Sequence, residues 1–158
     1  NYIVIKLSEQ RLRLSEHGAH SREYTVSTAA NGAGEKSGSE KTPSGWHRVR
    51  AKIGARCASG SVYVSRRPTG ELYSPALAAD NPQRDWILTR ILWLCGEEPG
   101  KNRLGDVDTM RRFIYIHGSP DDVAMGEPGS HGCVRMRDRD VIELFDRVAP
   151  GLPVLIEE

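Results

Sequence analysis

A histidine and a cysteine in the last third of the chain are residue types that carry out nucleophilic catalysis. His117 ends the strand-like run "RRFIYIHG", and Cys133 lies in "SHGCVRM" after a segment rich in Gly, Pro and acidic residues. Because that segment lets the chain fold back, the imidazole of His117 can approach the Cys133 thiol. Such a pair is the minimum for acyl transfer, in which a thiolate attacks a carbonyl while the imidazole accepts and returns a proton.

The backbone beside these residues can supply the other groups that acyl transfer requires. Gly118 follows His117 and brings no side chain, so its carbonyl is expected to accept the second imidazole N–H. The backbone N–H groups of His131, Gly132 and Cys133 are the natural donors to an oxyanion. Gly132 also lets a substrate approach the backbone without a side chain in the way.

The surroundings of Cys133 predict a reactive thiol. Arg135 and Arg137 follow it closely, and both would favour a negative charge on the sulfur. A helix is predicted directly after the cysteine, and the N-terminal end of a helix also favours an anion. We therefore expect a depressed pKa for this thiol and a thiolate near neutral pH.

Spacing alone leaves other interpretations of Cys133 open. His117, His131 and Cys133 could bind zinc. Asp121 or Asp122 would be the fourth ligand, but the spacing matches neither C-x-x-C nor H-E-x-x-H. The cysteine could also be a buried thiol without chemistry, as many free cysteines are. A redox sensor is a weaker alternative, because no resolving cysteine stands nearby in sequence.

The elements that must position these residues are mostly β-strands. Short alternating runs separated by turn residues predict hairpins in the first half, and Pro68 with Gly70 predicts another hairpin turn. The apolar runs "WILTRILWLC" and "RRFIYIHG" predict central strands buried on both faces. The remaining predicted strands are "YIVIKL", "RLRLSE", "REYTVST", "WHRVRAKIG" and "LPVLIE".

One main helix is predicted, and it follows Cys133. In "DRDVIELFDRV" the apolar residues Val141, Leu144, Phe145 and Val148 fall on one helical face, with Asp138 as the expected N-cap. The predicted architecture is thus a mostly β domain with one main α-helix late in the chain.

Length and charge limit the classes of function. The 158 residues fit one domain, 1–158, with a core of its own. The 22 basic and 21 acidic side chains leave a formal net charge of +1, which argues against a nucleic-acid or anionic membrane partner. No apolar run approaches the roughly 20 residues of a membrane helix.

At these residues the chain resembles the YkuD-type L,D-transpeptidase family. The family signature is a histidine, a spacer, then Ser/Thr-His-Gly-Cys, a hydrophobic residue and Asn or Arg, here "IHGSPDDVAMGEPGSHGCVRM". The segments "KTPSGWHRV" and "GDVDTMRRFIYIHGSP" resemble further parts of the family domain, so the resemblance covers most of the chain, from Tyr2 to Ile156. It implies a mostly β, sandwich-like catalytic fold that needs no metal and no organic cofactor.

The resemblance also implies a reaction. Members form an acyl-enzyme on peptidoglycan stem peptides and break the bond between the L-centre of the third residue, usually diaminopimelate, and a terminal D-Ala. By resemblance Cys133 is the nucleophile, His117 the general base and Gly118 the orienting carbonyl. A thiolate of this kind would also be trapped covalently by carbapenem-type β-lactams.

The remaining signature residues shape the site by the same resemblance. Ser130, His131 and Gly132 are implied to form the site and its oxyanion hole. Many members have Asn where this chain has Arg135, and we expect its guanidinium fork to hold a substrate carboxylate. Arg111 and Arg112 read as exposed charge at a strand end, and either could reach an anionic substrate. The loop 118–129 joins both halves of the site and is the candidate lid.

The motif leaves the second substrate open. Water would give an L,D-carboxypeptidase that trims soluble muropeptides, whereas an amine would give cross-linking or protein anchoring in the cell wall. The three cysteines fit reduced thiols better than a disulfide framework, although Cys57 could pair with Cys95. The quoted chain opens without an initiator Met or signal peptide. We therefore favour a cytoplasmic location and hydrolysis, with the cell envelope and transpeptidation expected if a leader was trimmed.

A module that binds wall fragments without turning them over is the rival from another functional class, and it requires a structural Cys133. His17, His20 and His47 are expected to be solvated, because they lie in predicted turns or on strand surfaces.

Overall fold

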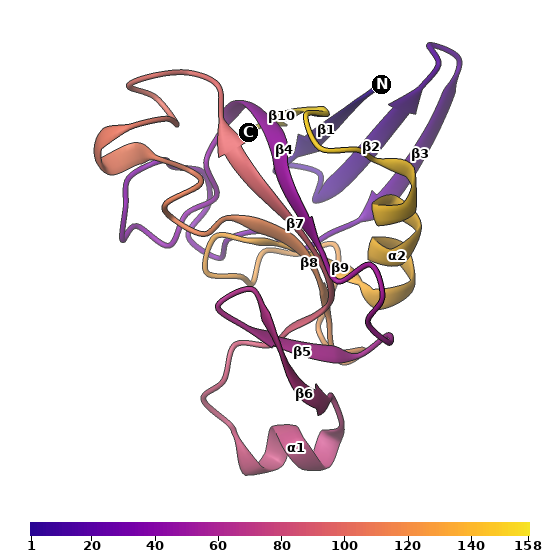
Figure 1. Ribbon diagram of the computed structural model, residues 1–158. Helices are drawn as coiled ribbons and strands as arrows, with labels where there is room; N and C mark the ends of the chain where they lie inside the picture. The colour runs from indigo at the N-terminus through magenta and orange to yellow at the C-terminus, as the bar shows by residue number, and fades with distance from the viewer.

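Ten β-strands form one hydrogen-bonded sheet in the computed structural model, which describes residues 1–158 (Figure 1). The strands and helices, in chain order, are β1 (Tyr2–Lys6), β2 (Arg11–Glu16), β3 (His20–Thr25), β4 (Gly45–Ile53), β5 (Ser61–Val64), β6 (Arg67–Leu72), α1 (Pro75–Asp80), β7 (Ile87–Gly96), the 3-10 turn η1 (Gly105–Val107), β8 (Tyr115–Ser119), β9 (Val134–Arg137), α2 (Asp138–Arg147) and β10 (Pro153–Glu157). The predicted mostly β class with one main helix is confirmed.

The sheet brings the two ends of the chain together. Its strand order is β3-β2-β1-β10-β4-β7-β5-β6, and β1 pairs with β10 in parallel. The predicted hairpins of the first half are present, because β1, β2 and β3 pair in antiparallel succession. The sheet curls, with β1–β3 at one end and the β5–β6 hairpin at the other (Figure 1).

Strands β7, β8 and β9 bring the two halves of the predicted site together. Strand β8 pairs with β7 on one side and with β9 on the other, and the β8–β9 pair is parallel. In this register His117 lies opposite Arg135. The chain therefore leaves β8 after the histidine and returns beside it at the start of β9, directly after Cys133.

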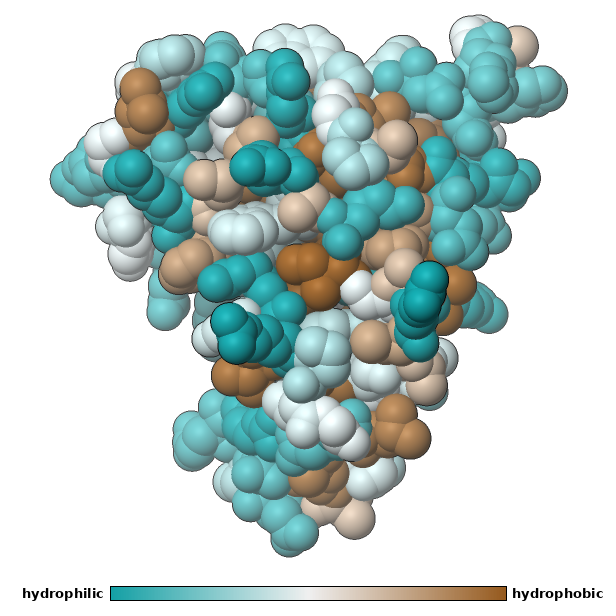
Figure 2. Space-filling view, viewed as in Figure 1, coloured by the Kyte–Doolittle hydropathy of each residue, from teal (hydrophilic) through white to brown (hydrophobic).

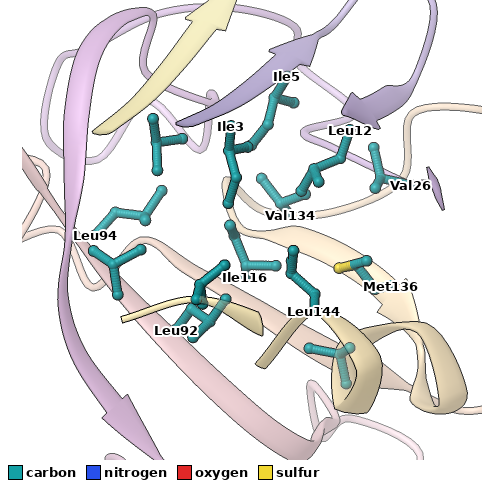
Figure 3. Packing of buried hydrophobic residues seen from close by; sticks show 14 of the residues in the cluster. Ile3, Ile5, Leu12, Val26, Leu92, Leu94, Ile116, Val134, Met136 and Leu144 are labelled. Atoms are coloured by element: carbon teal, nitrogen blue, oxygen red, sulfur yellow. The ribbon is translucent and has the colours of Figure 1, made fainter. Parts of the chain in front are cut away.

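Alternating apolar residues build the core on one face of the sheet. Ile3 and Ile5 of β1 point inward together with Leu12 and Leu14 of β2, as the period of two dictates. Figure 3 shows these strands packing toward Leu144 of α2, with Leu92, Leu94, Ile116, Val134 and Met136 between them. All five residues of β8 are buried, as predicted for a central strand.

Helix α2 covers strands β7, β8 and β9 with the predicted apolar face. Val141, Leu144 and Phe145 are its buried residues. Its start differs from the prediction: Asp138 is the first helical residue, and the N-cap Arg137 makes no side-chain capping bond. Strand β9 separates Cys133 from the helix, so the expected influence of a helix N-terminus on the thiol is wrong.

The hairpin β5–β6 turns earlier than predicted. Val64 pairs with Arg67, so the turn consists of Ser65 and Arg66, both at positive φ. Pro68 and Gly70 lie within β6 instead. An edge strand tolerates both residues because one of its sides needs no ladder hydrogen bonds.

One of the three histidines that were expected to be solvated is buried. His47 was expected to be solvated but is fully buried, with Nδ1 3.0 Å from the Gly45 carbonyl oxygen and Nε2 2.9 Å from Thr109 Oγ1. Its ring is thus paired on both sides, which makes the burial of a histidine possible. His17 and His20 are exposed as expected.

All three cysteines are free, so Cys57 and Cys95 do not pair.

The outer surface carries mostly hydrophilic side chains on the face drawn in Figure 2, with hydrophobic atoms in separated groups. None of the helices has the length and apolar character that a membrane crossing would require.

Candidate active site

A cleft of about 340 Å³ contains five of the seven residues that the sequence singled out. Cys133, His117, Ser130, His131 and Arg135 line it. Its other lining residues are Ser65, Arg66, Asp85, Ile87, Arg112, Phe113, Ile114 and Tyr115. The cleft therefore combines the loop 130–133, the first part of β8 with the residues before it, and the turn of the β5–β6 hairpin. His117 lies in the middle of β8 rather than at its end, because the strand continues to Ser119.

His117 is held in one orientation by the backbone that follows it. Its Nδ1 lies 2.6 Å from the carbonyl oxygen of Gly118, as expected from the sequence. Since a carbonyl only accepts, Nδ1 carries the proton and Nε2 has the free lone pair of a base. Burial lowers the pKa of His117, an effect that the Gly118 carbonyl and Asp85 oppose. The residue is 1% exposed, so the neutral ring is its resting form.

The Cys133 thiol rests in its protonated form. Its Sγ accepts a hydrogen bond from the Tyr115 backbone N–H at 3.3 Å and donates to the Phe113 carbonyl at 3.4 Å. Burial raises the pKa of this thiol to about 12; Tyr115 and the cleft arginines Arg135 and Arg112 oppose that rise. The expected depressed pKa is wrong, because desolvation of the thiolate outweighs the nearby positive charges.

Ser130 and Thr42 fix the turn that carries the thiol. Ser130 Oγ donates to the Cys133 carbonyl at 2.6 Å, which closes the turn 130–133. Thr42 Oγ1 donates to the Gly132 carbonyl at 2.9 Å and accepts from Ala29 N–H at 3.0 Å. Thr42 is fully buried. This residue comes from the segment "KTPSGWHRV", so its role is to tie that distant segment to the turn.

The backbone donors near the thiol are only partly available. Gly132 N–H donates to Ser130 Oγ at 3.2 Å, whereas the N–H groups of His131 and Cys133 have no acceptor within the protein. Gly132 has φ +132°, and a Cβ on it would lie 3.2 Å from Ile114 Cδ1 and 3.3 Å from the Lys41 carbonyl oxygen. The local backbone therefore depends on glycine and leaves two free donors for an oxyanion.

Asp85 is a site residue that sequence reasoning missed. Its Oδ1 accepts from Arg135 Nη2 at 3.1 Å, and its Oδ2 lies 3.8 Å from His131 Nδ1. Arg135 also donates to the Gly129 carbonyl at 3.1 Å. The arginine expected to hold a substrate carboxylate thus already pairs with a carboxylate of the protein. No local motif marks Asp85, which lies in the connection before β7.

Arg112 lines the cleft but is occupied by the backbone. Its Nη2 donates to the Lys41 carbonyl at 2.6 Å, and its Nη1 donates to the Glu35 carbonyl at 3.1 Å. Burial lowers its pKa. The side chain fastens the loop 34–41 to the site rather than presenting a free cation.

The four ligands of the alternative zinc site do not assemble: His117, His131 and Cys133 line one cleft, but neither Asp121 nor Asp122 does. Asp121 and Asp122 line a separate pocket with Asp138, away from Cys133. No group of three or more His, Cys, Asp or Glu residues in the structure is arranged to hold a metal ion. The candidate lid is anchored in its second half, where Gly126 N–H donates to the Val26 carbonyl and Gly129 N–H to the Thr28 carbonyl.

Comparison with known families decides the assignment of the chain. The model of the L,D-transpeptidase catalytic domain, YkuD, matches residues 1–156. The chain belongs to this family. A search of the curated proteins found no match. The resemblance inferred from "SHGCVRM" and its preceding histidine is confirmed.

Solved L,D-transpeptidases share the fold of this L,D-transpeptidase domain at low identity. The structure from Mycobacterium smegmatis is 18% identical with a TM-score of 0.58, covering 99% of this chain and 58% of that one. L,D-transpeptidase 3 from Mycobacterium tuberculosis with a faropenem-derived adduct is 17% identical with a TM-score of 0.58, covering 99% and 60%. The Enterococcus faecium enzyme is 18% identical with a TM-score of 0.54, covering 98% and 48%. The chain thus spans about half to three-fifths of the length of these proteins.

Proposed function

We propose that this L,D-transpeptidase domain is a cysteine acyl-transfer enzyme acting on peptidoglycan stem tetrapeptides. It breaks the bond between the L-centre of the third residue and the terminal D-Ala. The observation that carries the proposal is the pairing of His117 Nδ1 with the Gly118 carbonyl at 2.6 Å, in a residue that lines the same cleft as Cys133. This pairing leaves Nε2 as a base for the thiol.

Acylation begins from a neutral thiol and a neutral imidazole. As the sulfur attacks the scissile carbonyl carbon, Nε2 of His117 takes the thiol proton, and the free N–H groups of His131 and Cys133 stabilise the oxyanion. The C–N bond then breaks, and the imidazolium gives the proton to the departing amine of D-Ala. A thioester on Cys133 remains.

Deacylation by water is the favoured second half. Water attacks the thioester carbonyl, His117 accepts its proton, the C–S bond breaks, and the proton returns to the sulfur. Three free cysteines support a reducing compartment, in which soluble muropeptides are the substrates. The alternative is attack by an amine of a second stem peptide or protein lysine, which would make the domain a transpeptidase.

The same thiol would react with β-lactams of the carbapenem type. Attack on the strained lactam carbonyl breaks its C–N bond and leaves a thioester acyl-enzyme, in which the expelled nitrogen stays attached to the acyl group instead of departing. Support comes from the neighbouring L,D-transpeptidase 3, whose structure contains a faropenem-derived adduct. Intact-mass measurement after incubation with imipenem should give one adduct on wild type and none on Cys133→Ser.

Product analysis with a disaccharide tetrapeptide tests the proposal. Wild type should release D-Ala and leave the disaccharide tripeptide; with an added D-amino acid as acceptor amine, a transpeptidase would instead give exchanged tetrapeptide. Cys133→Ala and His117→Gln should lose at least about 1,000-fold in turnover, given the usual effect of removing a nucleophile or its base.

Two results would reject the proposal. If Cys133→Ala retains full turnover, the nucleophile is a different residue. If wild type binds the tetrapeptide and yields neither product, the domain is a binding module.

A further inference from the structure

Three arginines line the cleft, and they differ in what already occupies them. Arg112 donates to backbone carbonyls, and Arg135 pairs with Asp85. Arg66 makes one hydrogen bond, from Nη1 to the phenol oxygen of Tyr115 at 2.8 Å, and forms no ion pair. Because a guanidinium has five N–H donors in a fixed fork, Arg66 retains donors for an anionic ligand.

Aromatic rings hold this free guanidinium in place. Its central carbon lies 4.6 Å from the ring centroid of Trp93 and 4.7 Å from that of Phe113. Cation–π contacts of this kind fix the plane of a guanidinium without consuming its hydrogen-bond donors. Arg66 is therefore ordered before any ligand arrives, which lowers the entropic cost of binding.

Three residues around the free guanidinium, Ser65, Arg66 and Phe113, have strained backbone conformations. Ser65 and Arg66 form the hairpin turn at φ +48° and +65°, where glycine or asparagine is usual, and Phe113 has φ +56°. Phe113 is also half exposed. Non-glycine residues in this region cost free energy, and such strain concentrates at ligand sites. All three residues line the cleft.

Tyr115 links the guanidinium to the nucleophile. Its backbone N–H donates to Cys133 Sγ at 3.3 Å, and its phenol oxygen accepts from Arg66 at 2.8 Å. Arg66 and the thiol are thus connected through one tyrosine with a hydrogen bond at each end, and all three residues line the same cleft. In a substrate with its scissile carbonyl at the thiol, the terminal carboxylate lies one residue farther, roughly 3.5 Å along the chain.

We propose that Arg66 binds the terminal carboxylate of the leaving D-Ala and thereby selects peptides with a free C-terminus. This inference rests on the proposed function, because it assumes that the scissile carbonyl lies at Cys133. Arg66 is then the specificity-determining residue of the cleft, and Arg135 stays with Asp85.

A paired-substrate measurement tests this assignment. The substrates are the disaccharide tetrapeptide and the same compound with its terminal carboxylate amidated. For wild type, kcat/KM should be about 10- to 100-fold higher for the tetrapeptide with the free carboxylate than for its amide. This is the advantage expected from one charge-assisted hydrogen-bonded pair. Arg66→Gln should reduce that acid-to-amide ratio to near one while leaving the amide rate within about threefold.

Two variants control for folding and for general charge. Arg66→Lys keeps the charge but lacks the fork, so it should recover only part of the ratio. Arg67→Gln removes the adjacent exposed arginine of β6 and should leave the ratio unchanged. Equal losses on both substrates in Arg66→Gln would overturn the assignment, because they would reflect damage to the Tyr115 and Trp93 contacts.

A tetrapeptide with Lys in place of diaminopimelate shows which carboxylate of the substrate Arg66 binds, because it lacks the side-chain carboxylate of the third residue and keeps that of the terminal D-Ala. The effect of Arg66→Gln should persist on it, since its terminal carboxylate remains. Loss of the effect on this peptide would show that Arg66 reads the third residue instead, and would overturn the proposal.

Binding to inactive protein separates the two proposals. With Cys133→Ala as the background, Arg66→Gln should weaken tetrapeptide binding about 10-fold or more and leave binding of the amide unchanged. If wild type releases no D-Ala but this difference is present, the catalytic proposal fails and the Arg66 assignment stands. If D-Ala is released and neither the binding nor the acid-to-amide rate ratio depends on Arg66, the catalytic proposal stands and the Arg66 assignment fails.

Discussion

Arg135 Nη2 donates to Asp85 Oδ1 at 3.1 Å, and the other oxygen of the same carboxylate lies 3.8 Å from His131 Nδ1. Asp85 therefore joins two residues of the signature "SHGCVRM" from a position far earlier in the chain. Its negative charge also raises the pKa of the Cys133 thiol, whereas Arg135 lowers it. The ion pair thus sets how strongly Arg135 favours the thiolate.

Asp85→Asn should make Cys133 more nucleophilic. Loss of the carboxylate removes a negative charge near the thiol and frees Arg135, and both changes lower the thiol pKa. The rate of alkylation by iodoacetamide at pH 8 should rise several-fold, measured in a background with Cys57 and Cys95 changed to Ser. Asp80→Asn, at the end of α1, is the matched control and should not change the rate. An unchanged or slower rate in Asp85→Asn would contradict this electrostatic role.

Alkylation of Cys133 in the free enzyme should be slow at neutral pH. Burial raises the thiol pKa to about 12 from its ordinary value of 9.0, so the thiolate fraction at pH 7 falls about 1,000-fold. In the same background with Cys133 as the sole cysteine, the rate should still be rising at pH 10. A plateau below pH 8 would indicate a resting thiolate and would contradict the neutral pair.

The acid limb of kcat/KM should lie below pH 6.5. The proposed mechanism needs a neutral His117, and burial lowers the pKa of this imidazole from its ordinary 6.5. The base is therefore fully available from neutral pH upward, and activity decreases only as pH falls through the lowered pKa. A pH profile of tetrapeptide hydrolysis checks this, with a limb above pH 7 as the contrary result.

Thr42→Val should destabilise the turn 130–133 and slow catalysis. Valine keeps the shape of threonine but leaves the Gly132 carbonyl and the Ala29 N–H without their partner. The expected cost is about 1–3 kcal/mol in the free energy of unfolding. Thr42→Ser retains the hydroxyl and should recover most of both properties, as measured by denaturant unfolding and D-Ala release. If serine behaves as valine does, the methyl packing rather than the hydroxyl matters.

His47 should make the fold sensitive to acid. Burial lowers its pKa to about 4 in the folded protein from 6.5, so the unfolded state binds more protons between these two values. The free energy of unfolding therefore decreases as pH falls from 6.5 to 4, by about 3 kcal/mol from this residue. Urea unfolding of wild type and His47→Gln at pH 7 and pH 4.5 should show a smaller decrease for the variant. Parallel decreases in both proteins would assign the acid sensitivity to other groups.

Local patterns in the sequence were sufficient for most strands, for the main helix and for the meeting of His117 and Cys133 at one cleft. Alternation in β1 and β2 and the apolar face of α2 depend on neighbours within a few residues, because side-chain direction is a local property of the backbone. The turn of β5–β6 was misplaced because Ser65 and Arg66 adopt positive φ without the glycine or asparagine that would signal it. His47 was misjudged because its polar partner Thr109 is far away in sequence.

The sequence by itself determined the family signature, the identity of Cys133 and His117 as the candidate pair, and the Gly118 carbonyl beside the imidazole. Only the tertiary structure decided that burial keeps the thiol protonated, that Asp85 occupies Arg135, and that Arg66 is the unpaired guanidinium of the cleft. The physical reason is that desolvation and ion pairing depend on which distant segments meet. Asp85 and Arg66 come from connections that carry no motif, and the curl of the sheet brings them to the cysteine.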